Sequence, residues 1–241
     1  MPKYTIHLKE KRDVADGTLA FTFERPEGFV FKAGQNADYA LLNVPQEKLD
    51  AEGATRTFSF ANAPSEKDIL IATRMRDTAF KNILKELPAG ADVQIDGPYG
   101  NMVLHSNAAR PAVMLSGGIG ITPFRSMAVE AAAQKLPHKI FLFYSNRAPK
   151  DAAFLEELKE LEEENVNFKL IATMTDASDW PGEKGYINKE MIEKYVSPLF
   201  PILSSIFYLA GPPTMTDAMH KMLNGFGVSD DDIKMEEFSG Y

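Results

Sequence analysis

The sequence predicts two domains: an antiparallel β-barrel or sandwich in the N-terminal half, followed by an α/β domain with a parallel, doubly wound sheet. Short runs of alternating apolar and polar residues, separated by turn residues, continue to about position 105. Beyond about position 108, short apolar runs alternate with helical patterns instead. The 241 residues are enough for one large or two ordinary domains.

The N-terminal half contains six short runs with the character of strands. They lie at 5–8, 19–24, 37–42, 56–61, 69–73 and 93–95. Turn residues such as Asp16-Gly17 and Ala89-Gly90 separate them. A single short helix is predicted over 80–87, because Ile83, Leu84 and Leu87 share one face. Many short strands at this spacing favour an antiparallel barrel or sandwich.

The C-terminal half alternates strands with helices. Strands are predicted at 112–115, 139–145, 167–174 and 206–210, and helices at 123–135, 151–163, 189–195 and 214–224. The first of these strands is continuously apolar, as expected for a strand that is covered on both faces. This alternation predicts a parallel sheet. We place the boundary near 106–110, which divides the chain into domains 1–107 and 108–241.

Composition excludes several classes of function. The net charge of −8 argues against nucleic-acid or acidic-membrane partners, because those surfaces require a basic face. The chain has no cysteine, which removes disulfides and cysteine-ligated clusters, and its four histidines lack ligand spacing, so no metal site is predicted. The N-terminus lacks a signal-peptide pattern, and no apolar run reaches membrane-spanning length. We therefore expect a cytoplasmic protein.

A glycine-rich turn, Gly117-Gly118-Ile119-Gly120-Ile121-Thr122-Pro123, joins the first apolar strand to a helix. Thr122 can cap that helix, and Pro123 suits its first position. Free N–H groups at a helix N-terminus favour an anion such as a phosphate. The run departs from the dinucleotide pattern Gly-x-Gly-x-x-Gly, because Pro123 takes the third glycine position. The alternative is a tight turn that binds no ligand.

Two further segments suggest ligand contacts. In Arg56-Thr57-Phe58-Ser59, the guanidinium suits a pyrophosphate, the ring offers a flat face, and the serine offers a hydroxyl. The alternative is a surface arginine on an ordinary strand. The segment Ala210-Gly211-Pro212-Pro213-Thr214-Met215 is a second strand-to-helix turn, at the edge where open α/β sheets bind ligands. Its alternative is a loop stiffened by proline.

Taken together, these segments resemble the ferredoxin–NADP reductase superfamily over nearly the whole chain. Arg56–Ser59 is similar to the Arg-x-Tyr-Ser flavin motif, with Phe58 in place of tyrosine. The run 96–100 is similar to Gly-Pro-x-Gly, and 117–123 to the turn under the NAD(P)H pyrophosphate. Gly211-Pro212 with Met215 resembles Cys-Gly-Pro-x-x-Met, with Ala210 in place of cysteine. Glu237-Phe238 resembles the family's acidic-aromatic terminus.

The resemblance implies a six-stranded antiparallel Greek-key barrel that binds FAD and a C-terminal α/β domain that binds NAD(P)H. Arg56 would hold the FAD phosphates, Phe58 would pack on the flavin, and Ser59 would approach its N5 region, with Ser59, Glu237 and Phe238 as catalytic residues. The ring covering the flavin would be Phe238, with Tyr241 nearby as the alternative. Further flavin contacts would come from Thr57, Ala72, Thr73, Arg74, Ala79, Phe80 and Lys81, the last replacing a serine.

The resemblance also assigns the coenzyme positions. Gly117, Gly118, Gly120, Thr122, Pro123, Gly211, Pro212 and Met215 would contact NAD(P)H. Asn146-Arg147 would lie at the adenosine ribose, where an arginine can pair with the 2′-phosphate of NADPH. This slightly favours NADPH over NADH, with an exposed loop arginine as the alternative.

The implied activity is hydride transfer from NAD(P)H to FAD N5, followed by electron transfer to a separate acceptor. Ferredoxin- or flavodoxin-type proteins, an oxygenase component and free flavin are all open as acceptors. Ferredoxins and flavodoxins are acidic, so the overall negative charge of this chain speaks mildly against them. The alternatives are a non-catalytic electron-transfer or regulatory flavoprotein subunit of a larger complex, and a flavin module without turnover.

Overall fold

The first half of the chain forms one antiparallel sheet that curls round an apolar core. In the computed structural model, which describes residues 3–238, its strands are β1 (Lys3–Ala15), β2 (Thr18–Phe23), β3 (Asn36–Leu41), β4 (Thr55–Ser59), β5 (Ile69–Arg74) and β6 (Asp92–Tyr99). Their order is β4-β3-β6-β1-β2-β5. The edge strands meet, because Ala61 after β4 donates its N–H to the Leu70 carbonyl of β5 at 2.8 Å. This curled sheet confirms the antiparallel barrel and excludes the sandwich.

Strand β1 is much longer than the predicted run at 5–8. Its first half pairs with β6 and its second half with β2, so one polar-looking strand spans most of the barrel. Helix α1 (Ala79–Glu86) packs Phe80 and Leu84 into the barrel core. Thr78 caps that helix, since its hydroxyl accepts from the Lys81 N–H at 3.4 Å. A short 3₁₀ helix, η1 (Gln46–Lys48), lies in the connection from β3 to β4.

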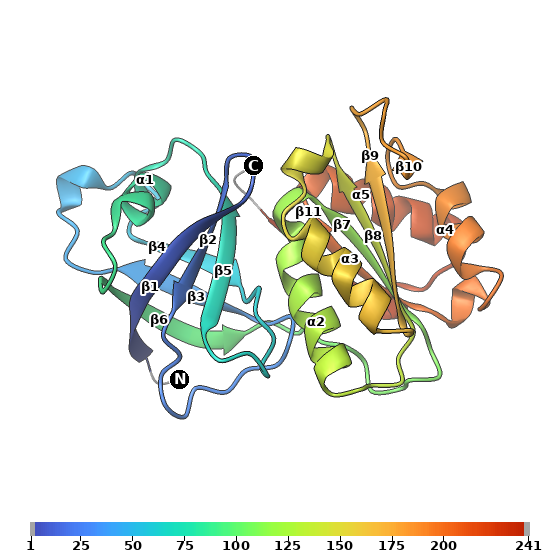
Figure 1. Ribbon diagram of the computed structural model, residues 1–241, viewed down its shortest axis with the longest axis horizontal. Helices are drawn as coiled ribbons and strands as arrows, with labels where there is room; N and C mark the ends of the chain where they lie inside the picture. The colour runs from blue at the N-terminus through green and yellow to red at the C-terminus, as the bar shows by residue number, and fades with distance from the viewer. Residues whose placement is uncertain (1–2, 239–241) are drawn as a thin grey trace.

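The second half forms a six-stranded parallel sheet (Figure 1). Its strands are β7 (Ala112–Gly117), β8 (Ile140–Asn146), β9 (Phe168–Met174), β10 (Glu183–Lys184), β11 (Ile206–Gly211) and β12 (Ile233–Glu237), in the order β10-β9-β8-β7-β11-β12. The helices are α2 (Ile121–Ala133), α3 (Leu155–Glu164), α4 (Lys189–Val196) and α5 (Pro213–Gly225). The 3₁₀ helices are η2 (Gly118–Gly120), η3 (Pro149–Asp151), η4 (Ile202–Ser204) and η5 (Asp230–Asp232). The parallel α/β prediction is confirmed.

Strand alternation distributes the apolar residues between two faces of this sheet. Met114 and Leu142 face α2 and α3, whereas Val113 and Phe143 face α4 and α5. Both faces are therefore buried, which explains why these strands are continuously apolar. The predicted boundary between residues 107 and 108 lies in the segment that joins β6 to β7.

Two strands and one helix start differ from the sequence prediction. The four predicted parallel strands become six, because β10 has only two residues and β12 is a charged edge strand without an apolar pattern. Helix α3 begins at Leu155 rather than near position 151, since η3 and a left-handed Phe154 (φ 60°) precede it. The short, charged sequence of β12 does not stand out as a strand, and no hydrophobic periodicity marks Leu155 as the start of α3.

The two sheets share one apolar cluster across their junction. Along β5, Ile69 and Ile71 point into the barrel core, whereas Leu70 and Ala72 join the cluster under α2. Phe124 and Met127 of α2 belong to the same cluster. Figure 1 shows α2 beside the barrel. The domains are therefore joined by buried apolar surface, which favours a fixed relative position.

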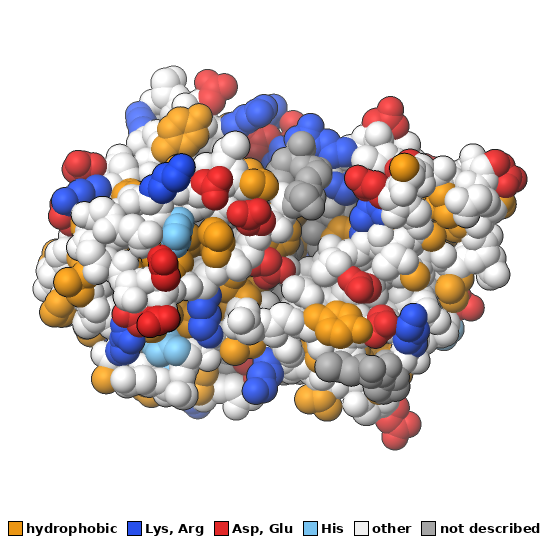
Figure 2. All heavy atoms as spheres, turned by 180° about the vertical axis from the view of Figure 1, so that it is seen from behind, with side chains coloured by type: hydrophobic (Ala, Val, Ile, Leu, Met, Phe, Trp, Pro, Cys, Tyr) orange, Lys and Arg blue, Asp and Glu red, His pale blue; other side chains and the backbone are white. Residues whose placement is uncertain are grey.

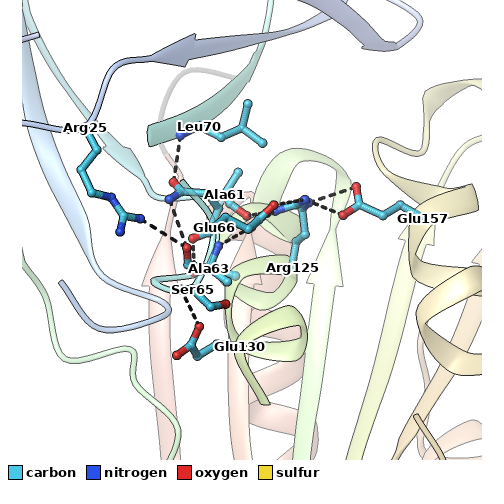
Figure 3. Close-up of polar contacts among 11 residues, drawn as sticks. Arg25, Ala61, Ala63, Ser65, Glu66, Leu70, Arg125, Glu130 and Glu157 are labelled. Atoms are coloured by element: carbon cyan, nitrogen blue, oxygen red, sulfur yellow. Dashed lines mark hydrogen bonds and ion pairs between the residues drawn. The ribbon is translucent and has the colours of Figure 1, made fainter. Parts of the chain in front are cut away.

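A buried arginine adds a polar connection at this junction (Figure 3). Arg125 of α2 donates to the Ala61 carbonyl at 2.6 Å and to both carboxylate oxygens of Glu66, at 2.9 and 3.0 Å. Its other partner is Glu157 of α3. The arginine side chain is 5% exposed, whereas Glu66 and Glu157 are 35% and 37% exposed. Burial would lower the pKa of Arg125, but hydrogen bonds with these carboxylates raise it.

We expect Arg125→Met to lower the free energy of unfolding by about 2 kcal/mol, because it removes the guanidinium that donates to the Ala61 carbonyl, Glu66 and Glu157. This loss of stability is smaller than that expected for breaking a fully buried ion pair, because water can reach the partly exposed carboxylates of Glu66 and Glu157. Denaturant unfolding measures the change. Lys150→Met is the control: it removes an exposed interdomain ion pair with Asp16, and we expect a change below ~0.5 kcal/mol. Equal stability of the two variants would contradict a structural role for Arg125.

Candidate functional site

The glycine turn lies between the ends of two parallel strands. A Cβ at Gly120 would lie 2.2 Å from the Ala210 carbonyl oxygen, and one at Gly117 would lie 2.2 Å from Met215 Sδ. Only glycine allows the β7 and β11 turns to approach this closely. Gly118 also has a positive φ of 53°. The turn is therefore shaped by contact between strand ends as well as by its own conformation.

Thr122 and Pro123 do not take the positions predicted for them. Helix α2 begins at Ile121, and Gly120 occupies its N-cap position. Thr122 is buried within the first turn, where its hydroxyl donates to the Ile119 carbonyl at 3.3 Å. This is a correction: Thr122 does not cap the helix, because η2 already turns the chain before α2 begins.

A cleft of about 610 Å³ opens beside this turn and is lined by both domains. Its barrel side includes Gly17 and residues 74–76, and its α/β side includes Gly117, Gly118, Asn146, Arg147, Pro212 and Met215. Gly211 precedes Pro212, and a Cβ at Gly211 would lie 3.2 Å from Met215 Sδ. The structure thus brings together most of the residues predicted to contact NAD(P)H.

The cleft carries a surplus of positive charge. Arg74, Arg76 and Arg147 line it, with Asp151 as an acidic neighbour. Arg74 donates to the Asp151 carbonyl at 3.2 Å and lies 4.0 Å from its carboxylate, which links the domains. Figure 2 shows Lys and Arg side chains gathered at the upper edge between the two halves. An anionic ligand fits this charge, although the whole chain is acidic.

The side-chain amide of Asn146, which lines this cleft, lacks hydrogen-bond partners among the described residues. It lies at the end of β8 and is 6% exposed. Neither its Nδ2 nor its Oδ1 has a partner among the described residues. A buried amide without partners is costly, so a ligand with both donors and acceptors would complete it.

A second polar group joins the two domains near the predicted flavin strand. Glu236 Oε1 of β12 accepts from Ser59 Oγ at 3.1 Å and from Asn36 Nδ2 at 3.0 Å. Its Oε2 is buried and has no partner within residues 3–238. Burial raises the pKa of Glu236, and the hydrogen bonds from Asn36 and Ser59 oppose this in part.

The carboxylate that bonds Ser59 belongs to Glu236, the neighbour of the predicted catalytic residue Glu237. Glu237 is exposed, because side chains alternate along β12 and Glu236 points inward. Asn36 was also missed, since nothing in its local sequence marks it. The sequence shows two acidic residues, Glu236 and Glu237, before Phe238. Only the register of β12 shows which of the two side chains points inward.

The aromatic residues have separate positions. Phe58 packs against Tyr39 and Phe80 at centroid distances of 5.7 and 5.9 Å and is only half-buried. Phe238 donates its backbone N–H to the Gly211 carbonyl at 3.1 Å and packs on the cluster under α2. This hydrogen bond places Phe238 beside the turn that follows β11. Tyr241, the alternative ring, lies outside the described residues.

The remaining predicted flavin contacts lie on β4, β5 and α1. Thr57 donates to Asp38, and Ala72 and Thr73 are buried on β5. Strand β5 also contacts η2, so this strand and the glycine turn are neighbours. Lys81 Nζ donates to the Arg74 carbonyl at 2.9 Å. Arg56 pairs with Asp50 and Glu52, and the Ala79 N–H is bonded to Asp50.

The cationic cleft and the Asn146 amide, which has no partner among the described residues, fit large, polar, anionic ligands such as FAD and NAD(P)H. The Glu236 oxygen that is unpartnered within the described chain would accept from a donor group of such a ligand. Within residues 3–238, no helix is both long and apolar enough to cross a bilayer. The same residues contain no group of three or more His, Asp or Glu side chains that could hold a metal ion.

Comparison with known proteins gives consistent matches. Residues 114–221 match the family model described as an oxidoreductase NAD-binding domain. The chain is 30% identical over 280 residues to the F component of the Na⁺-translocating NADH-quinone reductase of Idiomarina loihiensis, and 31% identical over 204 residues to that of Serratia proteamaculans. These alignments cover 99% and 78% of this chain. They cover 68% and 50% of the respective relatives.

Solved structures show the same fold. An Amycolatopsis cytochrome P450 reductase superposes with a TM-score of 0.82 at 24% identity, over 98% of this chain and 70% of that protein. A ferredoxin NADP⁺ reductase from Neisseria gonorrhoeae, solved with bound FAD and NADP, also gives 0.82 at 20% identity. That superposition covers 98% of this chain and 99% of the Neisseria chain.

We predict that Glu236→Gln changes the pH dependence of stability. Because the folded pKa is raised above the ordinary 4.5, the folded state holds the proton more tightly than the unfolded chain. That contribution is fully present below the ordinary pKa and is lost as pH rises through the raised value. The melting temperature of the variant should therefore rise relative to wild type as the pH increases above the ordinary glutamate pKa of 4.5.

Glutamine keeps an oxygen that can accept from Ser59 and Asn36, so the variant preserves the geometry. Glu237→Gln, at the exposed neighbouring position, is the control and should show no such trend. A pH-independent difference between Glu236→Gln and wild type would refute a raised pKa.

Proposed function

The chain belongs to the ferredoxin–NADP reductase superfamily, and from this premise we propose that it oxidises NAD(P)H through bound FAD and passes the electrons to a separate acceptor. The bound flavin would supply the redox chemistry, accepting a hydride from nicotinamide C4 at its N5. The protein's contribution would be to bind, orient and shield the two cofactors.

The observation that carries this proposal is the contact between β5 and η2 at the domain junction. Strand β5 holds Ala72, Thr73 and Arg74, which the family resemblance assigns to the flavin, and η2 belongs to the turn assigned to the NAD(P)H pyrophosphate. Cofactors bound at these two elements would meet at the junction. Reacting atoms must approach within about 3–3.5 Å for transfer, which neighbouring elements on a fixed scaffold favour.

Ser59 and Glu236 would act on protons at this junction. Ser59 is 3% exposed, and its hydroxyl is held by the Glu236 carboxylate. A carboxyl group with a raised pKa can hold a proton nearer neutral pH than an ordinary glutamate. We propose that the pair positions one proton near the flavin, a role that the sequence pattern assigned to Ser59 and Glu237. Phe238 would shield the ring.

The proposed acceptor is a ferredoxin- or flavodoxin-type protein, an oxygenase component or free flavin. A role within a larger complex is the second candidate, because the curated relatives are named as subunits of a Na⁺-translocating quinone reductase. In that case the electrons would leave to another protein of the complex. A cytoplasmic location without a membrane partner stays a prediction from the sequence.

We expect anaerobic addition of NADH or NADPH to the flavin-loaded protein to bleach the visible flavin absorbance. Hydride transfer removes the oxidised flavin chromophore, so bleaching tests cofactor binding and reduction together. An artificial one-electron acceptor should restore the colour. A yellow protein that neither coenzyme bleaches would refute the reductase function, and a protein that binds no flavin would refute the flavin site.

The coenzyme is inferred from the side chains at the end of β8. The Arg147 side chain is at the cleft, and no described residue forms an ion pair or hydrogen bond with it. A free guanidinium there can receive a 2′-phosphate, which slightly favours NADPH. The names of the relatives specify NADH, so we infer that both coenzymes are accepted.

If Arg147 binds the 2′-phosphate, Arg147→Leu should raise KM for NADPH by about tenfold and leave KM for NADH unchanged, because NADH lacks that group. Steady-state kinetics with both coenzymes measures this. Lys184→Leu on β10, whose ammonium donates to the Ser178 carbonyl, is the control and should change neither value. Equal losses with both coenzymes would show that Arg147 does not distinguish them.

A further inference from the structure

Arg56, the residue assigned to the flavin phosphates, is already bonded by residues that precede it in the chain. We call residues 46–54, between β3 and β4, the acidic loop, because it carries Glu47, Asp50 and Glu52. Arg56 Nη1 donates to the carbonyls of Glu52, Gly53 and Thr55 at 2.9, 3.2 and 2.8 Å. Both terminal nitrogens of the guanidinium are therefore occupied, since Nη2 contacts two carboxylates of the loop.

Asp50 joins this guanidinium to the start of α1. Its Oδ1 lies 3.3 Å from Arg56 Nη2 and accepts the Glu52 N–H at 3.0 Å. Its Oδ2 accepts the N–H of Ala79, the first residue of α1, at 3.2 Å. A guanidinium together with a free N–H of a helix N-terminus is the donor set that proteins use for phosphate. The carboxylate thus bonds both donors.

More cations gather here than these contacts neutralise. Burial lowers the pKa of Lys81, and the charges of Arg76 and Arg56 lower it further, against one opposing contribution from Glu52. Lys81 itself donates to the Arg74 carbonyl, which carries no charge. Three neighbouring cations therefore face two carboxylates of the acidic loop. A doubly charged diphosphate in place of Asp50, together with Glu52, would supply three negative charges.

We propose that Asp50 is an internal substitute for a flavin phosphate, so that the acidic loop competes with the diphosphate of FAD for Arg56 and the first turn of α1. This inference rests on the proposed function, because it assumes that the barrel binds a flavin. It goes beyond that function by assigning a competing role to a residue outside the flavin motif. The competition weakens binding of phosphate-bearing flavins and leaves binding of the flavin ring itself unaffected.

A purely structural Asp50 is the competing explanation. In that case the carboxylate would hold Arg56 in position for the phosphate, and removing its charge would weaken FAD binding. The contacts favour competition, because Asp50 takes the N–H of Ala79 as well as the guanidinium, and the Glu52 carboxylate and three carbonyls accept from the terminal nitrogens of Arg56. If Asp50 only positioned Arg56 for a phosphate, the terminal nitrogens of Arg56 and the N–H of Ala79 would be free to bind it.

The test is Asp50→Asn in the full chain, with flavin removed and then titrated back as FAD or as riboflavin. Asparagine keeps an oxygen for the Glu52 N–H and for Arg56 but loses the charge. Quenching of flavin fluorescence gives both dissociation constants without any turnover. We expect the variant to bind FAD about tenfold more tightly and riboflavin, which has no phosphate, as tightly as wild type does.

Two further variants keep the test interpretable. Glu52→Gln removes a carboxylate that contacts Arg56 but not α1, so it should tighten FAD binding less than Asp50→Asn does. Asp68→Asn, in the same domain, breaks an ion pair with Lys9 and should leave both constants unchanged. Equal melting temperatures would show that the variants are folded.

Each result decides the inference. FAD binding that is weaker or unchanged in both Asp50→Asn and Glu52→Gln would overturn it, and so would equal tightening for riboflavin. In either case wild type could still bind FAD and be bleached by NAD(P)H, so the proposed function would stand. Failure of the wild-type protein to bind any flavin would overturn the proposed function and this inference together.

Discussion

The buried contact between the barrel and α2 is the constraint on which the candidate site depends. Leu70 and Ala72 of β5 belong to the same apolar cluster as Phe124 and Met127 of α2, and Arg125 bonds the barrel from within that helix. This shared core sets where β5 lies relative to the glycine turn. Because the site is built from both sides of the junction, neither sheet could form it alone.

Charge is arranged around this junction by local pairing. The chain is acidic overall, yet arginines and a lysine line the cleft and the start of α1. Carboxylates from other segments hold two of them: Asp151 contacts Arg74, and Asp50 contacts Arg56. Glu66 contacts Arg125 of α2 in the same way at the domain junction. Arg147 has no such partner among the described residues. The net charge of a chain therefore says little about the electrostatic potential inside one cleft, because nearby charged side chains and their ion pairs determine it.

Strongly patterned elements were predictable from the sequence, and weakly patterned ones were not. The apolar strands β7, β8, β9 and β11 and the helices between them follow hydrophobic runs and periodicity. Strand β12 has no such pattern, because it is stabilised by pairing with β11 rather than by an apolar face. Without the register of this strand, nothing in the sequence marked Glu236 as the residue that faces Ser59. Likewise, Thr122 has the sequence context of a helix cap, but η2 moves the helix start to Ile121.

The sequence by itself determined the fold class, the glycine turn and the residue types that suit phosphates. These features depend on the local pattern of residues and on the chemistry of side chains that are close together in the sequence. Only the tertiary structure decided which groups meet. Ser59 and Asn36 reach Glu236 across 177 and 200 positions, and Asp50 reaches Ala79 across 29. Such pairings follow from strand register and from packing between sheets, which are collective properties of the folded chain and leave no mark at any single residue.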